Sequence, residues 1–539
     1  MALTTNLCHA ISKFEIGDKM LNYWWVTRPK RKLNSIPNVL SIFAESAMHE
    51  AWNGQRNSHL SLESALERSG LKRTGDRRDQ TGGGGRTYKA WLVSLGLVFV
   101  QKSTQKLKLT LAGEAILNGE SPVKILTNQI MKYQFPSAFS LEHSVNVNLR
   151  FKIHPFWFLL KLLTDNRVQY LTQEEIAKII IVEAENESPK CYEKIVSRII
   201  EFRNFGDGCL EEDFARKYTS SKGNVNFKNP FAHLQDIANT IINWLEYTQL
   251  VIREEKKLRI LPDRAKEVDV IVANAISFIS RPEDHEYFQR RYGLDTEHVK
   301  DTRNLLETSV VTDFMIAEMS VRKIFISKAL KEPIGFITPT LINQISEESG
   351  IKLSVVTEVL QKNFPHGLIG AFMANYFEMA FAGREQCRQF EEATANIFRD
   401  IFRFNSTWLG SSASGKEVPD ILLISDSAGF QAIIDTKAYS YYDLPTAHRD
   451  RMIYHYLPDI NNYSSSGLPL GFFSYIAGGF SNTIANPLND IVRKSHVNGS
   501  AMPVTVFIKM IENHSTKPYA HSDVKKIFTL NRRVDIHDL

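Results

Sequence analysis

The stretch KEVPDILLISDSAGFQAIIDTKAY, residues 416–439, decides the fold of the C-terminal part of the chain. Two apolar runs, 421–424 and 430–434, flank the segment 425–429, which is composed of residues that favour turns. Apolar runs on either side of a short polar segment ending in glycine are typical of two antiparallel strands. The sequence therefore predicts a β-hairpin in this part of the chain.

The predicted hairpin gathers three charged residues at one end. With the turn centred between positions 427 and 428, Asp420 lies opposite Asp435, and opposed side chains have Cβ atoms about 4.5–5.5 Å apart. Side chains alternate along a strand, so Lys437 shares the face of Asp435. Two carboxylates so close repel each other unless a cation lies between them. Mg²⁺ suits such an all-oxygen site, and it keeps waters that can become a nucleophile.

The combination of Asp420, Asp435 and Lys437 matches the PD-(D/E)xK arrangement of nucleases, in which the lysine orients water or offsets charge on the phosphate. An acidic, helix-like stretch at 389–404 precedes the hairpin and strengthens this interpretation. The pattern Asp-x-Lys alone is common. The alternative is a surface hairpin whose aspartate and lysine form a weak ion pair.

Length and composition limit the remaining possibilities. The 539 residues correspond to about three to four domains. With 43% hydrophobic and 23% charged residues the composition is that of a folded protein. The longest apolar runs, 91–100 and 156–160, are far shorter than the ~20 residues that span a bilayer. The start of the chain has no export pattern, and the four cysteines form no CxxC pair. We therefore expect a soluble, cytoplasmic protein without a membrane partner, a disulfide scaffold or a cysteine-based zinc finger.

The net charge of +5 is unevenly distributed along the chain. Residues 1–120 hold 17 Lys and Arg against 10 Asp and Glu, so this segment carries +7. A basic surplus at one end is typical of a nucleic-acid-binding region, although it can also serve solubility alone.

The segment 60–115 predicts a winged helix. SLESALERSGL (61–71) and RTYKAWLVSLGL (86–97) have helical spacing, and LVFV (97–100) and LKLTL (107–111) form a candidate hairpin. Helix, helix, hairpin is the order in which a winged helix presents a helix or a wing to DNA, although such modules also bind proteins. WLEYTQLVIR (244–253) repeats the spacing of WLVSLGLVFV (91–100) and leads to LRIL (258–261), which indicates a second unit.

Basic residues in these units are the candidates for DNA contacts. Near the N-terminus, Trp24 and Trp25 precede basic residues around Pro29, a combination that either grips a phosphate backbone or forms a core tryptophan pair beside a solvated turn. Each candidate can equally be a solvated charge, and one sequence does not separate base readers from backbone contacts. The candidates are Arg28, Lys30, Arg31, Arg73, Arg77, Arg78, Arg86 and Lys89.

Two resemblances are visible in the chain. The segment AIIDTKAYSYYDLP (432–445) resembles the cleavage-domain core of the FokI type of type IIS restriction endonucleases. The N-terminal two thirds resembles the AlwI family of type IIS enzymes and their strand-nicking relatives. The segments that carry this second resemblance are YWWVTRPKRKL (23–33), GGRTYKAWLVSLGLVFV (84–100), 109–137 and IVSRIIEFRN (195–204).

The resemblance implies a Mg²⁺ site with a third carboxylate and a possible histidine. In these families a glutamate on the helix before the hairpin joins the two aspartates, and Glu391 is the best match, with Glu392 beside it as the weaker choice. In nicking relatives a histidine after the lysine contributes. His455 corresponds to it, and His448 is a second option; a half-buried helix histidine is the structural alternative.

We therefore expect a multidomain protein: mainly α, winged-helix-like recognition modules followed by a C-terminal α/β PD-(D/E)xK nuclease domain. The expected boundaries are 1–145 and 146–280 for the two modules, 281–370 for a helical connector, and 371–539 for the nuclease. The resemblance implies a cytoplasmic bacterial type IIS restriction endonuclease that binds a short asymmetric double-stranded DNA site and cuts a few bases outside it. One such domain cuts one strand, so a transient homodimer or a second nuclease subunit is expected. A protecting DNA methyltransferase is the expected functional partner.

Two alternatives stay open. The chain can be a strand-specific nicking enzyme or the large subunit of a heterodimeric enzyme. It can also be a winged-helix DNA-binding regulator whose nuclease-like domain is inactive.

Overall fold

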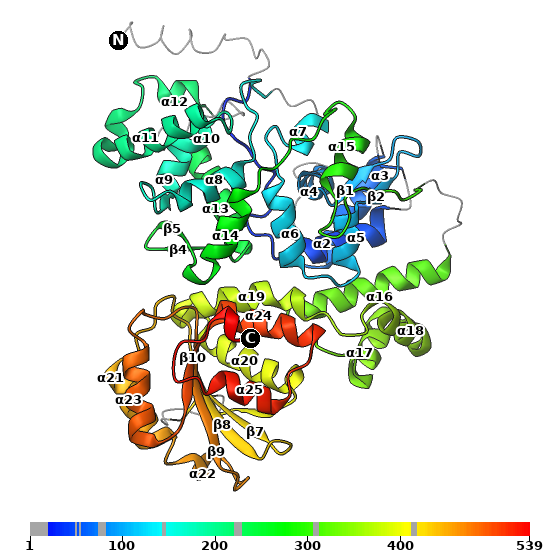
Figure 1. Ribbon diagram of the computed structural model, residues 1–539. Coiled ribbons are helices and arrows are strands. Elements are labelled where there is room, and N and C mark those ends of the chain that lie inside the picture. The colour runs from blue at the N-terminus through cyan, green and yellow to red at the C-terminus, as the bar shows by residue number, and fades with distance from the viewer. Residues whose placement is uncertain are drawn as a thin grey trace, which may run out of the picture.

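The computed structural model describes residues 20–48, 51–52, 55–73, 82–142, 147–219, 229–305, 312–410 and 418–539. Of the predicted contacts, Arg77 and Arg78 lie outside these ranges. A largely helical region forms the upper part of the molecule and an α/β domain the lower part (Figure 1). No helix among the described residues combines the length and the apolar character needed to cross a bilayer.

The first part of the helical region contains the expected helix, helix and hairpin. Strands β1 and β2 pair antiparallel, with Val98 opposite Leu109 and Val100 opposite Leu107, as the apolar runs predict. Helix α5 begins after Thr110, whose side chain accepts a hydrogen bond from the Gly113 amide. The elements are α2 (Ile36–Ala47), α3 (Arg56–Arg68), α4 (Gly83–Ser94), β1 (Val98–Val100), β2 (Leu107–Leu109), α5 (Leu111–Leu117), α6 (Pro122–Met131) and α7 (Ala138–Glu142).

The second part repeats a helix followed by a hairpin. Helix α13 leads into β4 and β5, which pair antiparallel, and the short β3 adds a third strand beside β5. The elements are α8 (Pro155–Thr164), β3 (Leu171–Thr172), α9 (Gln173–Glu175), the π-helical turn Ile176–Ile180, α10 (Ile181–Glu183), α11 (Pro189–Phe205), α12 (Phe214–Lys217), α13 (Ala232–Tyr247), β4 (Val251–Glu254), β5 (Lys257–Ile260) and α14 (Ala265–Ala273).

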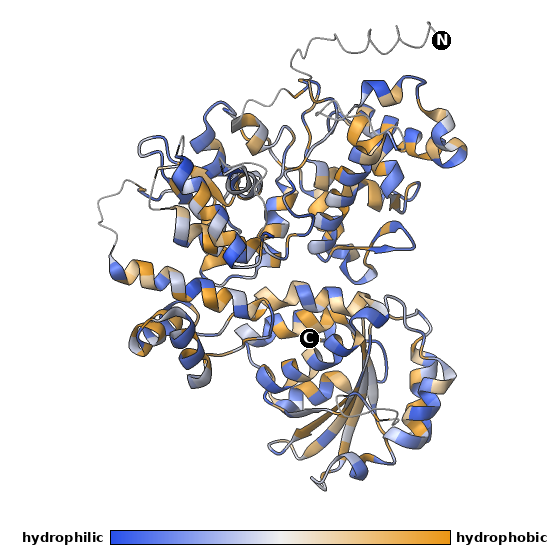
Figure 2. Ribbon diagram, turned by 180° about the vertical axis from the view of Figure 1, so that it is seen from behind, coloured by the Kyte–Doolittle hydropathy of each residue, from blue (hydrophilic) through white to orange (hydrophobic). Residues whose placement is uncertain are grey.

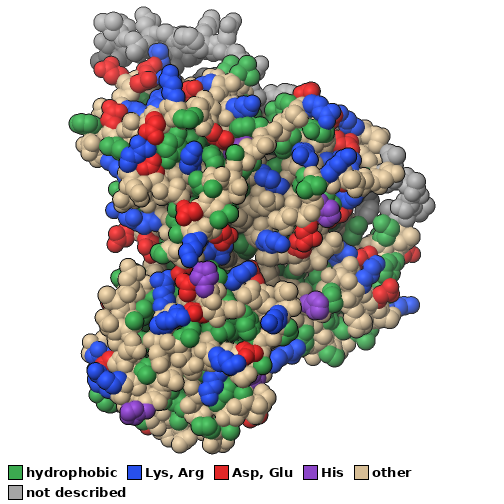
Figure 3. All heavy atoms as spheres, viewed as in Figure 1, with side chains coloured by type: hydrophobic (Ala, Val, Ile, Leu, Met, Phe, Trp, Pro, Cys, Tyr) green, Lys and Arg blue, Asp and Glu red, His purple; other side chains and the backbone are tan. Residues whose placement is uncertain are grey.

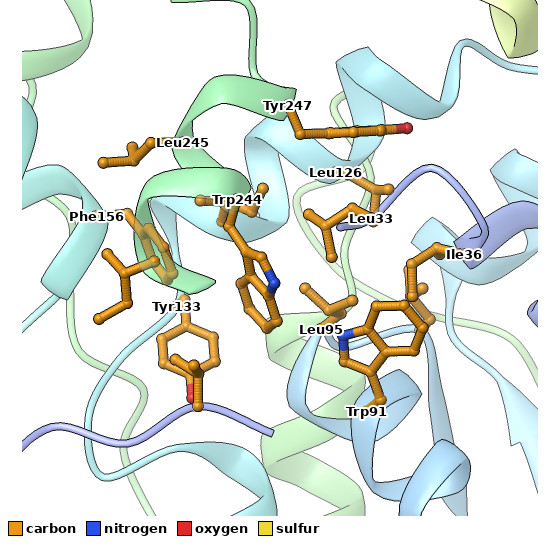
Figure 4. Packing of buried hydrophobic residues seen from close by; sticks show 14 of the residues in the cluster. Leu33, Ile36, Trp91, Leu95, Leu126, Tyr133, Phe156, Trp244, Leu245 and Tyr247 are labelled. Carbon is orange, nitrogen blue, oxygen red and sulfur yellow. The ribbon is translucent and has the colours of Figure 1, made fainter. Parts of the chain in front are cut away.

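The two helix-to-hairpin units share one apolar core. Trp91 on α4 and Trp244 on α13, which have the same spacing to the following strand, are both fully buried and point into one cluster (Figure 4). Phe156 stacks on Trp244 with ring centroids 5.6 Å apart. Trp24 is also buried, and its indole donates to the Ala184 carbonyl at 2.8 Å. Of the two alternatives for this pair, a phosphate contact or a core tryptophan pair, the structure supports the core position for Trp24.

Five helices connect the helical region to the α/β domain. Asp284 caps α15 by accepting a hydrogen bond from the Tyr287 amide at 3.1 Å. Helix α15 packs on β1 and α7, whereas α16 packs on α2. The helices are α15 (His285–Tyr292), α16 (Asp313–Ala329), α17 (Pro339–Ser349), α18 (Leu353–Asn363) and α19 (Ile369–Phe381).

Helix α19 is shared between the two halves of the molecule. Ala371 and Ala374 pack in the core of the helical region, whereas Tyr376 and Phe377 pack in the core of the α/β domain. The predicted boundary between residues 370 and 371 falls inside this helix, and that boundary stays a prediction. Figure 2 shows apolar residues where the helices meet one another and the sheet.

Residues from the second hairpin also contact the α/β domain. Ile252 and Leu261 belong to the same core as the domain's own apolar residues. Asp263 pairs with Arg533 and accepts from the Thr505 hydroxyl at 3.3 Å. These contacts join segments about 250 residues apart in sequence.

The α/β domain is built on a mixed five-stranded sheet with strand order β10-β9-β8-β7-β6. Strand β7 pairs antiparallel with both β6 and β8, whereas β8, β9 and β10 are parallel. Helices α20, α24 and α25 cover one face, and α21 and α23 cover the other (Figure 1). The elements are α20 (Cys387–Asp400), β6 (Asn405–Trp408), β7 (Ile421–Ser425), β8 (Phe430–Lys437), α21 (Thr446–Arg451), the π-helical turn Met452–Tyr456, α22 (Ile460–Tyr463), β9 (Leu470–Ala477), α23 (Ala485–Ser495), β10 (Gly499–Pro503), α24 (Val504–Thr516) and α25 (His521–Phe528).

Candidate active site

The β7–β8 hairpin has the register that the turn predicts. Ile421 pairs with Ile434 and Leu422 with Ile433, so Asp420 and Asp435 are the next positions outward. Gly429 closes the turn with a φ of +65°, a conformation that glycine adopts without strain. The start of β7 and the end of β8 therefore meet where the charged residues were predicted.

Lys437 lies between the two aspartates. Its Nζ is 2.8 Å from Asp435 Oδ1 and 3.8 Å from Asp420 Oδ2. It also donates to the Thr436 carbonyl at 3.0 Å. The side chains of Asp435, Lys437 and Asp420 are only 6%, 15% and 16% exposed, so the charges interact with little screening by solvent.

The backbone and side chain of Thr436 hold Asp420 in place. The Thr436 amide donates to Asp420 Oδ2 at 2.6 Å, and its hydroxyl donates to the same oxygen at 3.1 Å. Strand alternation turns Thr436 away from its neighbours Asp435 and Lys437. One residue of β8 thus orients the carboxylate that lies immediately before β7.

Burial and mutual repulsion shift the pKa values of these groups. Burial raises the pKa of Asp420 well above its usual value, and the charge of Asp435 raises it further. Burial lowers the pKa of Lys437, but Asp435 and Asp420 raise it, and the net shift is upward. Lys437 therefore stays protonated and partly offsets the repulsion between the carboxylates.

Glu391 approaches the same end of the sheet from α20. Its Oε2 accepts from the indole Nε1 of Trp408, at the end of β6, at 3.2 Å. Burial raises the pKa of Glu391; the Trp408 hydrogen bond lowers it, and Asp435 raises it. Glu392 next to it is exposed. Of the two glutamates, Glu391 is the one brought towards the hairpin carboxylates.

The donor set fits a hard divalent cation. Three carboxylates approach one another where little solvent reaches them, and the pKa values of two of them are raised. A bound Mg²⁺ ion offsets the repulsion between such carboxylates. Within the described ranges, no group of three His, Cys, Asp or Glu side chains is close enough to enclose an ion as placed. Lys437 lies between the two aspartates instead. A bound cation would take over part of its role in offsetting the repulsion between them.

His448 and His455 lie differently with respect to the site. His448 Nδ1 is 2.8 Å from the Tyr442 hydroxyl, and burial and the charge of Lys437 lower the pKa of this histidine. His455, in the π-helical turn, is exposed. The structure thus brings His448 near the charged cluster through Tyr442 and leaves His455 at the surface.

The residues predicted to contact DNA differ in their surroundings: some form ion pairs, some are exposed and one is buried. Arg28 and Arg31 both pair with Asp236 on α13, Arg28 at 3.1 Å. Burial lowers the pKa of Lys30. Arg73 and Arg86 are exposed. Lys89 is only 3% exposed, because it lies on the side of α4 that faces the core, and this placement weighs against a DNA contact.

Three residues of the site were not identified from the sequence. Thr436 could have been found, because the predicted register places its amide beside Asp420. Trp408 belongs to a strand of four mostly polar residues that has no clear pattern. Tyr442 lies after the lysine, in a segment that bridges to Phe480 beyond β9, and no local pattern indicates its hydrogen bond with His448.

Comparisons with known proteins give two family matches and several similar solved structures, among them FokI and the BpuJ1 endonuclease binding domain. Residues 93–318 match the AlwI restriction endonuclease family, and residues 350–535 match the FokI cleavage domain. No curated protein sequence matches the chain significantly. The structure of restriction endonuclease FokI is 14% identical, covers 95% of this chain and 100% of its own, and has a TM-score of 0.28. The structure of FokI bound to DNA is also 14% identical, covers 96% of this chain and 100% of its own, and has a TM-score of 0.27.

The third structure is the BpuJ1 endonuclease binding domain in complex with pyrene- and phenanthrene-modified DNA. It is 14% identical, covers 52% of this chain and 100% of its own, and has a TM-score of 0.34. The family assignment rests on the two sequence matches, which together take in most of the chain and leave residues 319–349 between them. The chain is therefore a restriction endonuclease in which an AlwI-family region is joined to a FokI cleavage domain.

Proposed function

We propose that this type IIS enzyme binds a short asymmetric double-stranded DNA sequence through its helical region and hydrolyses phosphodiester bonds a few bases outside it. The observation that carries the proposal is the convergence of Asp420, Asp435 and Lys437 at one end of the mixed sheet, with Glu391 approaching. The helix-to-hairpin units at 1–145 and 146–280 act as winged-helix-like recognition modules. The exposed Arg73 and Arg86 are the best placed of the predicted contacts.

Asp420, Asp435 and Glu391 would hold Mg²⁺, which supplies Lewis-acid stabilisation and an activated water when bound. Thr436 fixes the orientation of Asp420, and Asp435 holds the Lys437 ammonium at 2.8 Å. Lys437 orients the attacking water and offsets the negative charge that develops on the phosphate oxygens. His448, paired with Tyr442, is a better placed candidate for a proton-handling role than His455.

The cleavage experiment tests the whole proposal. Purified protein is incubated with supercoiled plasmid and either Mg²⁺ or EDTA, and both strands are sequenced by run-off. Discrete Mg²⁺-dependent breaks at a constant offset from a shared short motif are expected. Breaks confined to one strand would indicate a nicking enzyme or one subunit of a pair. No such breaks on several diverse plasmids would favour a DNA-binding regulator.

A double-strand break requires two nuclease domains, because one set of carboxylates acts on one strand at a time. We propose transient homodimerisation through the nuclease domain on DNA, or recruitment of a second nuclease subunit. A protecting DNA methyltransferase in the same cell is the functional partner. The dependence of double-strand cleavage on protein concentration, measured below the DNA concentration and above it, distinguishes self-association from a single active chain.

Divalent cations should stabilise the free protein against unfolding. Mg²⁺ relieves the repulsion between Asp420 and Asp435, and a ligand at a hundredfold excess over its Kd contributes about 2–3 kcal/mol. Thermal unfolding without DNA, with Mg²⁺ or with EDTA, measures the effect. Asp420→Asn should abolish it, whereas Asp426→Asn, at the exposed turn of the same hairpin, should not. An equal Mg²⁺ effect in wild type and Asp420→Asn would place the ion elsewhere.

A further inference from the structure

A cluster of cations surrounds one tyrosine on the second hairpin unit. The ring centroid of Tyr170 is 4.0 Å from Arg203 Cζ, 4.7 Å from Lys257 Nζ and 4.9 Å from Arg259 Cζ. Lys257 and Arg259 are two residues apart on β5, so they share one face of the strand. Arg203 reaches the ring from the end of α11. We call these four residues the Tyr170 cluster.

The Tyr170 cluster has more positive than negative charge. Arg203 is neutralised by Glu175, whose Oε1 is 2.6 Å from its Nε. Lys257 and Arg259 form no ion pair with any acidic side chain in the described part of the chain; Glu254, which faces Lys257 across the hairpin, forms none with it. Lys256, at the turn of the hairpin, adds an exposed cation to the same edge.

The ring of Tyr170 explains how the cations can be held together. An aromatic face attracts cations through its quadrupole, and this attraction offsets part of their mutual repulsion. The guanidinium of Arg203 also donates to the carbonyls of Val168 and Tyr170 itself, at 2.9 and 2.6 Å, so it is fixed beside the ring. Lys257 and Arg259 have no such second partner, and their charged ends are available to an anion.

The location of the Tyr170 cluster suits a large anionic partner. Strands β4 and β5 lie at the edge of the helical region that faces the α/β domain (Figure 1). Lys and Arg side chains occur on both sides of the hollowed surface between the two regions (Figure 3). Because Ile252 on β4 packs in the core of the α/β domain, a ligand at this hairpin lies close to the joint between recognition and cleavage.

We propose that Lys257 and Arg259 form a contact site for the phosphate backbone of double-stranded DNA, with Tyr170 and Arg203 positioning them. The inference rests on the proposed function, since it names where the recognition region holds its substrate. Backbone phosphates fix the position of a protein on the duplex without reading its sequence. The site therefore contributes affinity equally on cognate and unrelated DNA.

The test is the salt dependence of DNA binding by the full chain in EDTA, where cleavage does not interfere. The probe is a fluorescent 30-base-pair duplex of arbitrary sequence. Each phosphate contact contributes about 0.9 to the slope of log K against log salt concentration. The double variant Lys257→Gln and Arg259→Gln should lower the slope by about 1.8 and weaken binding about tenfold. Lys257→Arg, which keeps the charge, should bind like wild type.

A matched control removes two exposed lysines elsewhere. Lys331→Gln, in the turn after α16, combined with Lys362→Gln, on α18, changes the net charge equally, and α18 lies on the opposite side of the molecule from β5 (Figure 1). An unchanged slope in the Lys257/Arg259 variant, or an equal loss in this control, would overturn the contact site. Equal thermal unfolding midpoints show that the variants are folded. Failure of the wild-type protein to bind the duplex would contradict the proposed function itself, and the inference that rests on it.

Discussion

Replacing Asp435 with asparagine is expected to reduce the rate of DNA strand cleavage by at least about 10³-fold and to leave DNA binding in EDTA unchanged. Asparagine has nearly the same shape but lacks the charge that holds Lys437 at 2.8 Å and contributes to the cation site. The side chain is 6% exposed, so solvent does not replace the lost interaction. Single-turnover cleavage of a plasmid and titration of a labelled duplex measure the two effects separately.

The controls for this prediction come from the same hairpin. Asp426→Asn removes an exposed carboxylate at the turn and should cleave at the wild-type rate. Lys437→Ala should be as inactive as Asp435→Asn while still binding DNA, because it leaves two neighbouring carboxylates without their cation. Loss of binding together with cleavage in either inactive variant would contradict the separation of recognition from catalysis. Normal cleavage by Asp435→Asn would place the active site elsewhere.

Replacing Trp244 with alanine is expected to lower the free energy of unfolding by about 3–5 kcal/mol. Trp244 is fully buried where the two helix-to-hairpin units meet, stacked on Phe156 and edge-on to Tyr133 at 6.0 Å. The cavity left by the indole cannot close completely, because aromatic side chains on several helices line it. Urea unfolding followed by circular dichroism measures the change.

Trp244→Phe is the informative control for the alanine variant. The indole Nε1 is buried and has no hydrogen-bond partner among the residues that the structure describes, so its loss leaves no acceptor there unpaired. Phenylalanine keeps an aromatic ring against Phe156 and should cost only about 1–2 kcal/mol. Equal losses in the two variants would show that the full shape of the indole, and not the presence of an aromatic ring against Phe156, determines the stability of this core.

The sequence predicts the β7–β8 hairpin well because its geometry is set by local rules. The turn fixes the register, the register places Asp420 beside Asp435, and alternation places Lys437 on the same face. Glu391 required the family resemblance, since a helix preceding a hairpin does not reveal which of two adjacent glutamates points inward. The predicted helix at 389–404 ends at Asp400, four residues early, and the chain then enters β6.

The rest of the site depends on contacts that no local pattern encodes. Strand β9 pairs in parallel with β8, and β10 pairs in parallel with β9, each after a long crossover, so the order of these strands is not readable from spacing alone. In the recognition region, the pairing of Arg28 and Arg31 with Asp236 joins residues more than 200 positions apart. Lys89 was assigned to the surface by its charge, although its helical position turns it inward.

Helix α19 couples the unfolding of the two parts of the molecule, because its opposite sides pack in two different hydrophobic cores. Unfolding of the α/β domain would strip Tyr376 and Phe377 of their neighbours and remove the support for Ala371 and Ala374 in the other core. Further contacts between the two parts have the same effect: Ile252 and Leu261 pack in the core of the α/β domain, and Asp263 pairs with Arg533. Neighbouring units that share this much apolar surface do not open independently. We therefore expect the AlwI-type and FokI-type parts, distinct as families, to unfold in one cooperative transition, so that a destabilising change in either part also lowers the stability of the other.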